Sequence, residues 1–167
     1  MRLDEWNDRY RSREEIDLTP ARLLTDFAAV LTPGRALDLA CGAGRNALWL
    51  AQQGWDVTAI DGAEEAIRLV RDHDAGIDTR VLDLETGAPL PFEDGSFDLV
   101  VILYFLYRPL FAEAQRVVRP GGVVLTAVRT SGRFSLSLEE LRGEFSGWEV
   151  LHAGAGDTAE LVVRRRT

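Results

Sequence analysis

The fold is decided by the stretch Arg35-Ala36-Leu37-Asp38-Leu39-Ala40-Cys41-Gly42-Ala43-Gly44-Arg45-Asn46-Ala47. An apolar strand ends there at glycines and is followed at once by a helical pattern. Gly42 and Gly44 let the backbone approach a ligand closely because they carry no Cβ atom. The helix that follows points its unpaired N–H groups and the positive end of its dipole at the same place. The sequence therefore predicts a ligand cradle at this junction.

A second strand, 56–60, ends in an acidic residue, Asp61. In nucleotide-binding folds an acid at about this separation from the glycine turn binds the ribose hydroxyls. An ionised carboxylate suits that task because it only accepts hydrogen bonds. The alternative is that Asp61 caps the helix expected at 63–74, and one side chain can fill both roles.

Strands and helices alternate along the chain. This alternation predicts right-handed crossovers and a parallel sheet, that is, a doubly wound α/β fold. The strands 148–152 and 160–163 are too close for a crossover helix, so we expect a C-terminal antiparallel hairpin. The remaining strands are expected at 36–39, 56–60, 79–82, 97–103 and 122–128, the helices at 20–31, 45–53, 63–74, 109–118 and 137–145, and a turn at 119–122.

Composition limits the function classes. A chain of 167 residues with 46% hydrophobic content is expected to form a single domain over 1–167. Its net charge of -8 argues against a nucleic-acid partner. The longest apolar run, 99–106, is far shorter than the roughly 20 residues of a membrane helix. Since Cys41 is the single cysteine and no signal-peptide core is visible, we expect a cytoplasmic protein with a small-molecule substrate.

These features together resemble the class I S-adenosylmethionine-dependent methyltransferases. The resemblance rests on Asp38 within the first strand, Pro120-Gly121-Gly122 before the fifth, and the final hairpin. Residues 37–46 and 54–61 are similar to the small bacterial branch that includes tellurite-resistance-type enzymes. The resemblance implies a seven-stranded sheet of order 3-2-1-4-5-7-6 and S-adenosylmethionine as cofactor, released as S-adenosylhomocysteine. One departure is Ala40, which stands where many members have a glycine.

The resemblance also assigns cofactor-binding residues. The loop 38–44 would hold the methionine part, and Asp83 with the Leu84 backbone would hold the adenine. The alternatives are that Asp38 caps or pairs within the sheet, although burying an acid without a partner is costly, and that Asp83 only begins a turn. The full set is Asp38, Ala40, Gly42, Gly44, Asn46, Asp61, Gly62, Asp83 and Leu84.

Residues that contact the molecule accepting the methyl group are expected after the strand 97–103. Tyr104 is the predicted catalytic contact, with Tyr107 and Arg108 beside the substrate, although part of this aromatic run is equally suited to packing. The segment 1–18 is predicted to be a lid over the cofactor or a clasp onto the helix 20–31. Within it, Trp6 and Tyr10 would share one helical face. A homodimer could also complete the pocket.

The predicted reaction is methyl transfer to a small-molecule heteroatom such as a thiol. A thiol is already partly ionised near neutral pH and needs no strong base. Cys41, His73 and His152 are not expected to act in catalysis or to bind a metal. One alternative is a non-catalytic S-adenosylmethionine-binding module. The other is an NAD(P)-dependent oxidoreductase, which predicts a third glycine near position 47, where the chain has alanine.

Overall fold

The structure, a computed structural model, describes residues 2–12, 16–74 and 76–167. These residues form two compact units, one up to Thr86 and the other spanning Gly87–Thr167. Each unit is described by itself below. Our assignment of one functional domain over 1–167 stays a prediction.

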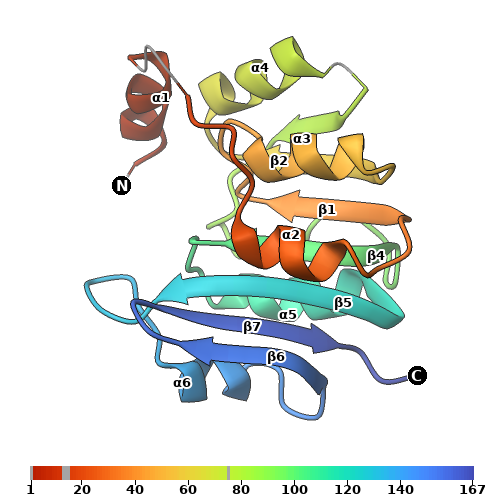
Figure 1. The fold of residues 1–167 in the computed structure, drawn as a ribbon. Helices are drawn as coiled ribbons and strands as arrows, with labels where there is room; N and C mark the ends of the chain where they lie inside the picture. Colours follow the sequence, from red (N-terminus) through yellow and green to blue (C-terminus); the bar gives the residue numbers. More distant parts are fainter. Residues whose placement is uncertain (1, 13–15, 75) are drawn as a thin grey trace. The chain divides into compact units, whose positions relative to one another are not determined.

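The first unit contains three parallel strands and four helices (Figure 1). Parallel pairing joins Arg35 to Asp56 at the starts of two strands, and Thr58, inside the second of them, to Asp78 at the start of the third. The strands 35–39 and 56–61 are mostly apolar and buried, as expected for a sheet covered on both faces, whereas the edge strand 78–81 is only partly buried. The strands are β1 (Arg35–Leu39), β2 (Asp56–Asp61) and β3 (Asp78–Val81), and the helices are α1 (Leu3–Arg11), α2 (Arg22–Ala28), α3 (Arg45–Gln52) and α4 (Glu64–His73).

The second unit combines a parallel strand pair with the C-terminal hairpin. β4 and β5 are parallel, whereas β7 runs antiparallel to both β5 and β6 (Figure 1). Phe111 contacts Phe145 edge-on, with ring centroids 5.6 Å apart, in the core beneath these strands. The elements are β4 (Phe97–Leu103), α5 (Pro109–Val117), β5 (Val118–Arg129), α6 (Leu138–Gly143), β6 (Glu149–Ala155) and β7 (Thr158–Arg164).

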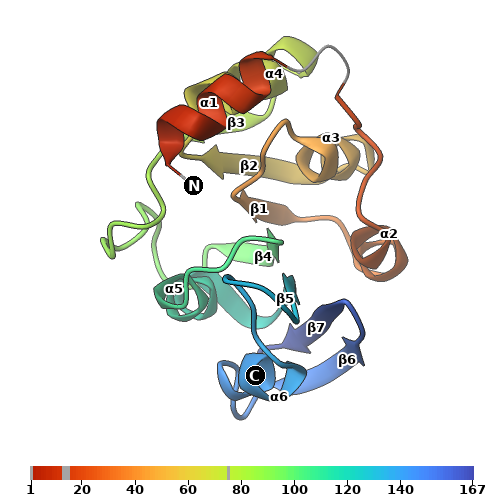
Figure 2. The same ribbon diagram turned by 90° about the vertical axis from the view of Figure 1, so that its left-hand side faces the viewer.

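The strand order is β3-β2-β1-β4-β5-β7-β6, which confirms the predicted doubly wound α/β fold with an antiparallel end. Figure 2 shows the strand ends from which the loops of the predicted site arise. In a parallel sheet these carboxyl-terminal ends are where ligands bind.

The expected turn at 119–122 is wrong, because β5 already begins at Val118. The register of the β4–β5 pair shifts between Phe97 and Leu99, so the glycine-containing segment bulges instead of ending the strand. Gly121 N–H donates to the Arg165 carbonyl at 2.8 Å, and Arg165 N–H donates to the Gly122 carbonyl at 2.9 Å. This pairing keeps the segment within the sheet.

Candidate cofactor-binding site

The loop between β1 and α3 has the backbone conformation of a tight cradle. Ala40, Gly42 and Gly44 all have left-handed φ angles, of 57°, 57° and 94°. At Gly44 the space is also closed, because an added Cβ would lie 2.7 Å from Val70 Cγ2 of α4. Position 44 therefore requires glycine for both its conformation and its contact.

Asp38 brings a buried carboxylate beneath this loop. The residue is only 2% exposed, and its Oδ2 atom has no hydrogen-bond partner among the described residues. Burial, followed by the nearby Asp61, raises the pKa of Asp38 to about 7, against the opposing effects of Arg45 and the Ala47 N–H. A buried acid oxygen without a partner is costly unless a ligand supplies a donor or a positive charge.

Asp61 ties the loop after β1 to the start of α4. Its Oδ2 accepts the Gly42 N–H at 2.9 Å, and its Oδ1 accepts the Ala63 N–H at 2.8 Å. Burial raises the pKa of Asp61, while the same two N–H groups act in the opposite direction. Each carboxylate oxygen has a second lone pair, so this anchoring is compatible with accepting a ribose hydroxyl.

The other predicted cofactor residues occupy different environments. Asn46 is buried, and its Oδ1 accepts the Ala21 N–H at 2.9 Å, which fixes the segment before α2. The exposed Asp83 accepts the Glu85 N–H at 2.9 Å in a turn, and Leu84 beside it is buried. Gly62 lies under α1, because a Cβ at this glycine would be 2.6 Å from Leu3 Cδ2.

The predicted acceptor-side residues lie in the second unit, just after β4. Tyr104 is half exposed and has a left-handed φ of 60°, and its N–H donates to the Ala127 carbonyl at 2.8 Å. A bulky residue in this conformation is strained, and such strain concentrates at functional positions. Arg108 pairs with Glu140 and Glu144 of the α6 region, each at 3.5 Å. Tyr107 is partly buried.

Trp6 and Tyr10 lie on α1, which packs beside α4 in the first unit. Their rings stack with centroids 5.9 Å apart. The Tyr10 hydroxyl lies over Gly42, since a Cβ at that glycine would be 2.8 Å from it. The sequence pattern predicted the shared face of the two aromatic residues, but it carried no signal for the docking of α1 on α4.

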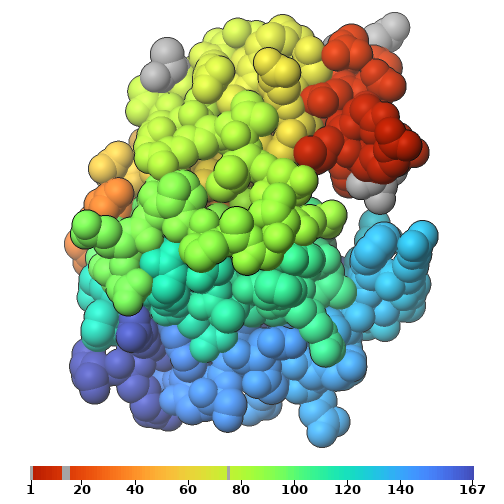
Figure 3. All heavy atoms as spheres, turned by 180° about the vertical axis from the view of Figure 1, so that it is seen from behind, coloured from red at the N-terminus to blue at the C-terminus, as the bar shows by residue number. Residues whose placement is uncertain are grey.

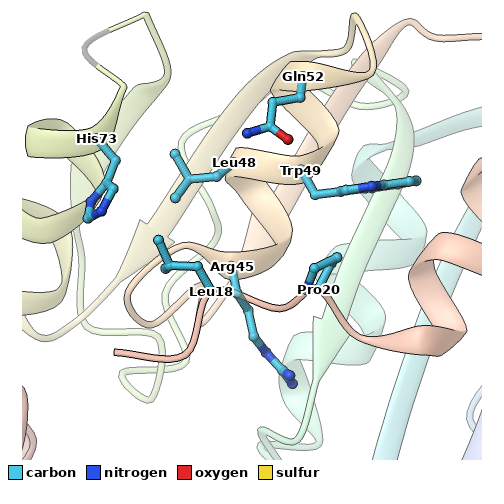
Figure 4. Close-up of a pocket in the computed structure, with 7 residues that line it drawn as sticks. All are labelled: Leu18, Pro20, Arg45, Leu48, Trp49, Gln52 and His73. Carbon is cyan, nitrogen blue, oxygen red and sulfur yellow. The ribbon is translucent and has the colours of Figure 1, made fainter. Parts of the chain in front are cut away.

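A shallow hollow of about 170 Å³ lies on the outer side of α3 (Figure 4). Its lining contains none of the predicted cofactor residues; it consists of Leu18, Pro20, Arg45, Leu48, Trp49, Gln52 and His73. Arg45 Nη1 donates to the Thr19 carbonyl at 3.3 Å, and His73 Nδ1 is 2.8 Å from the Leu69 carbonyl. Both contacts lie within the first unit.

The remaining metal-ligating side chains form no metal-binding cluster among residues 2–12, 16–74 and 76–167. No cluster of three or more His, Cys, Asp or Glu there could hold a metal ion. Cys41 is buried in the cradle loop, and burial raises the pKa of its thiol. His152 lies 3.5 Å from Glu160 in the hairpin. None of the helices in this part of the chain is long and apolar enough to cross a membrane.

Comparison with known proteins settles the family. The family described as "Methyltransferase domain" matches residues 37–126, which include the cradle loop, Asp61 and Tyr104. The chain belongs to this methyltransferase family. A ubiquinone biosynthesis O-methyltransferase of Xanthomonas campestris is 33% identical over 133 residues, covering 72% of this chain and 55% of the relative.

A second relative, TehB, is matched both in sequence and in structure. The probable S-adenosyl-L-methionine-dependent methyltransferase TehB of Haemophilus influenzae is 28% identical over 145 residues, covering 77% of this chain and half of TehB. The TehB crystal structure matches with a TM-score of 0.78 at 20% identity, over 98% of this chain and 67% of TehB, and shows the same fold. The chain spans about half the length of the curated relatives it matches.

Family membership makes S-adenosylmethionine the cofactor of this domain, and the cradle fits it. Asp38 Oδ2 has no hydrogen-bond partner among the residues that the structure describes, and a positively charged ligand group would supply one. At Gly42 the Tyr10 hydroxyl borders the space of an added Cβ, and the loop leads into the backbone N–H groups at the start of α3. Both observations concern the first unit alone.

Proposed function

We propose that the chain transfers a methyl group from S-adenosylmethionine to a small-molecule acceptor, with a thiol or another soft nucleophile as the accepting group. The observation that carries this proposal is the buried Asp38 Oδ2 beneath the glycine loop, for which the described part of the chain supplies no hydrogen-bond partner. Without a cationic ligand, a carboxylate oxygen that is buried at this point without a hydrogen-bond partner costs stability.

Each part of the cofactor has a candidate partner in the first unit. The loop 38–44 would hold the methionine part, Asp61 the ribose, and Asp83 with the Leu84 backbone the adenine. The free lone pairs of Asp61 and the exposed carboxylate of Asp83 support these roles. Asn46 would act indirectly, by holding the segment before α2 through Ala21.

When bound, S-adenosylmethionine supplies an electrophilic methyl group on a positively charged sulfur. Only interactions that are stronger in the transition state accelerate transfer, so negative side chains should hold the ends of the cofactor rather than the sulfur. We place Tyr104 on the acceptor side. Its strained backbone and half-exposed ring support a role in orienting the acceptor.

A thiol acceptor fits a site that orients its substrate without a strong base. Thiols have a pKa near 8.5, so a useful fraction is thiolate at neutral pH. The protein then contributes mainly by placing the nucleophile close to the methyl group, which is worth on the order of 7–11 kcal/mol in favourable cases. A hydroxyl or amine acceptor would need a positioned proton acceptor in addition.

The test is incubation of the purified protein and S-adenosylmethionine with panels of small thiols, phenols and amines. Mass spectrometry should detect the gain of one CH₂ unit on a thiol, with stoichiometric formation of S-adenosylhomocysteine. The same gain only on phenols or amines would overturn the acceptor class. No gain on any panel member, together with tight cofactor binding, would favour the non-catalytic binding module.

Calorimetry with S-adenosylhomocysteine and NADH separates the remaining alternative. Binding of NADH without binding of S-adenosylhomocysteine would overturn the proposal in favour of an oxidoreductase. We also propose that the protein acts in the cytoplasm, supported by its single, unpaired cysteine, and that it forms a homodimer. Sedimentation velocity tests the dimer directly.

A further inference from the structure

The loop between β5 and α6, residues 130–136, lies at the carboxyl-terminal end of the parallel strand pair in the second unit. Leu103 of β4 pairs with Ala127 of β5, and the Tyr104 N–H donates to the Ala127 carbonyl at 2.8 Å. Both strands therefore end at one edge of the sheet, and ligands of open α/β sheets bind outside this edge. In the space-filling view of Figure 3 the light-blue loop stands out from the surface.

Hydrogen bonds on both sides fix the outer part of this loop. The Ser135 hydroxyl donates to the Gly132 carbonyl at 2.8 Å, and the Leu136 N–H donates to the Arg129 carbonyl at 3.0 Å. Ser135 also forms a parallel bridge with Arg129, the last residue of β5. The two residues between Gly132 and Ser135 are thus held at the surface by a defined backbone.

These two residues, Arg133 and Phe134, form a cation–aromatic pair. Phe134 is 56% exposed, and the Arg133 guanidinium carbon lies 5.3 Å from the centroid of its ring. The attraction arises from the electrostatic quadrupole of the ring and does not require the guanidinium N–H groups as hydrogen-bond donors. The pair therefore presents a positioned positive charge with donors available to a ligand.

Arg133 differs in its charge partners from Arg108, the arginine that the sequence placed beside the substrate. Arg108 is paired with Glu140 and Glu144, each at 3.5 Å. Arg133 forms no ion pair with any carboxylate of the residues that the structure describes. In a chain with a net charge of -8, this arginine is a local attraction for anions. Its forked donors match the two oxygens of a carboxylate.

We propose that the methyl acceptor carries a carboxylate in addition to its accepting thiol, and that Arg133 binds this carboxylate. Arg133 is then a specificity-determining residue, and Phe134 is the positioning residue that holds its guanidinium. The inference rests on the proposed function. A contact to a group that does not react leaves the thiol unhindered and contributes by placing the acceptor.

The test is calorimetric titration of the protein saturated with S-adenosylhomocysteine, which measures acceptor binding without transfer. The two probes are 3-mercaptopropionate and 3-mercaptopropionamide, which have the same length and differ in charge. The wild type should bind the carboxylate about tenfold more tightly than the amide, as expected for a charge-assisted hydrogen bond. Arg133→Gln should lower this preference to less than about twofold and leave the amide Kd unchanged.

Two further variants test the role of the ring. Phe134→Leu should lower the preference about threefold, because the cation–aromatic contact is lost, whereas Phe134→Tyr keeps the ring and should retain it. The Kd of S-adenosylhomocysteine should stay at the wild-type value in both. Arg166→Gln is the matched control, because it removes one positive charge at the exposed C-terminal end, and it should leave the preference unchanged.

Equal binding of the two thiols by the wild type, or the wild-type preference in Arg133→Gln, would overturn the carboxylate site. Failure of the proposed function gives a different result. If neither thiol is methylated by S-adenosylmethionine while the binding preference depends on Arg133, the carboxylate site is supported and thiol transfer is overturned.

Discussion

At the scale of single residues, Asp38 links the stability of the fold to pH. Its raised pKa means that the folded protein retains a proton between about pH 4 and pH 7 that the unfolded chain has lost. The free energy of unfolding should therefore fall as the pH rises through this window. Asp38→Asn should flatten the fall measured by urea denaturation, to which Asp61, whose pKa is also raised, contributes in the same direction. An unchanged slope in the variant would contradict this expectation.

Asp61 offers a test of ribose binding. Asp61→Asn keeps one of the two oxygens that accept the Gly42 and Ala63 N–H groups and loses the charge, and it should weaken S-adenosylhomocysteine binding by about 1.5–3 kcal/mol, or tenfold to a hundredfold. Asp56→Asn, at the exposed start of the same strand, is the control and should leave the affinity unchanged. Equal affinities of the two variants would remove the ribose assignment.

Tyr104 should show a trade between stability and activity. Asparagine adopts left-handed φ angles readily, so Tyr104→Asn should raise the free energy of unfolding by about 0.5–1 kcal/mol through relief of strain. The same variant should lower the transfer rate while its cofactor Kd stays at the wild-type value. A stabilised variant with full activity would show that the tyrosine has no acceptor-side role.

Residues close to one another in sequence were the predictable part of the site. The glycine loop with Asp38, and the strand ending in Asp61, follow from local patterns whose chemistry is general. The Asn46–Ala21 bond joins residues 25 positions apart, and the Asn7–Glu65 bond joins residues 58 apart. No periodicity or spacing signals such contacts, because they depend on how helices dock after the sheet has formed.

At the scale of elements, strand and helix order was predictable because hydrophobic periodicity is local. The boundaries of the elements were less predictable. Helix α2 is shorter than the predicted 20–31, and β5 extends back to Val118. The extension depends on pairing with Arg165, at the far end of the chain. Tertiary partners, rather than local preference, set such limits.

The capping box of α6 provides an element-scale prediction. Ser137 Oγ accepts the Glu140 N–H at 3.1 Å, while Glu140 Oε2 accepts the Ser137 N–H at 2.9 Å. Ser137→Ala should lower the free energy of unfolding by about 1 kcal/mol. Ser131→Ala, in the preceding loop, is the control for urea denaturation, and equal losses in both variants would argue against a cap effect.

At the scale of the whole molecule, ligand binding should appear as thermal stabilisation. S-adenosylhomocysteine at about 100 times its Kd should add about 2.7 kcal/mol to the stability of the folded state. For a chain of this size that corresponds to a rise in Tm of roughly 5–10 °C by calorimetric scanning. NADH at the same concentration should leave Tm unchanged, and a larger shift with NADH would contradict the family assignment of the cradle.

Cys41 is a natural chemical probe of the cradle loop. The sequence has only this cysteine, and it lies 7% exposed in the loop whose neighbour, Gly42, is covered by Tyr10. A thiol-reactive reagent can therefore modify the chain at one position only, and only when that loop is uncovered. The alkylation rate thus counts opening events at the cradle in an unmodified protein, with no engineered label.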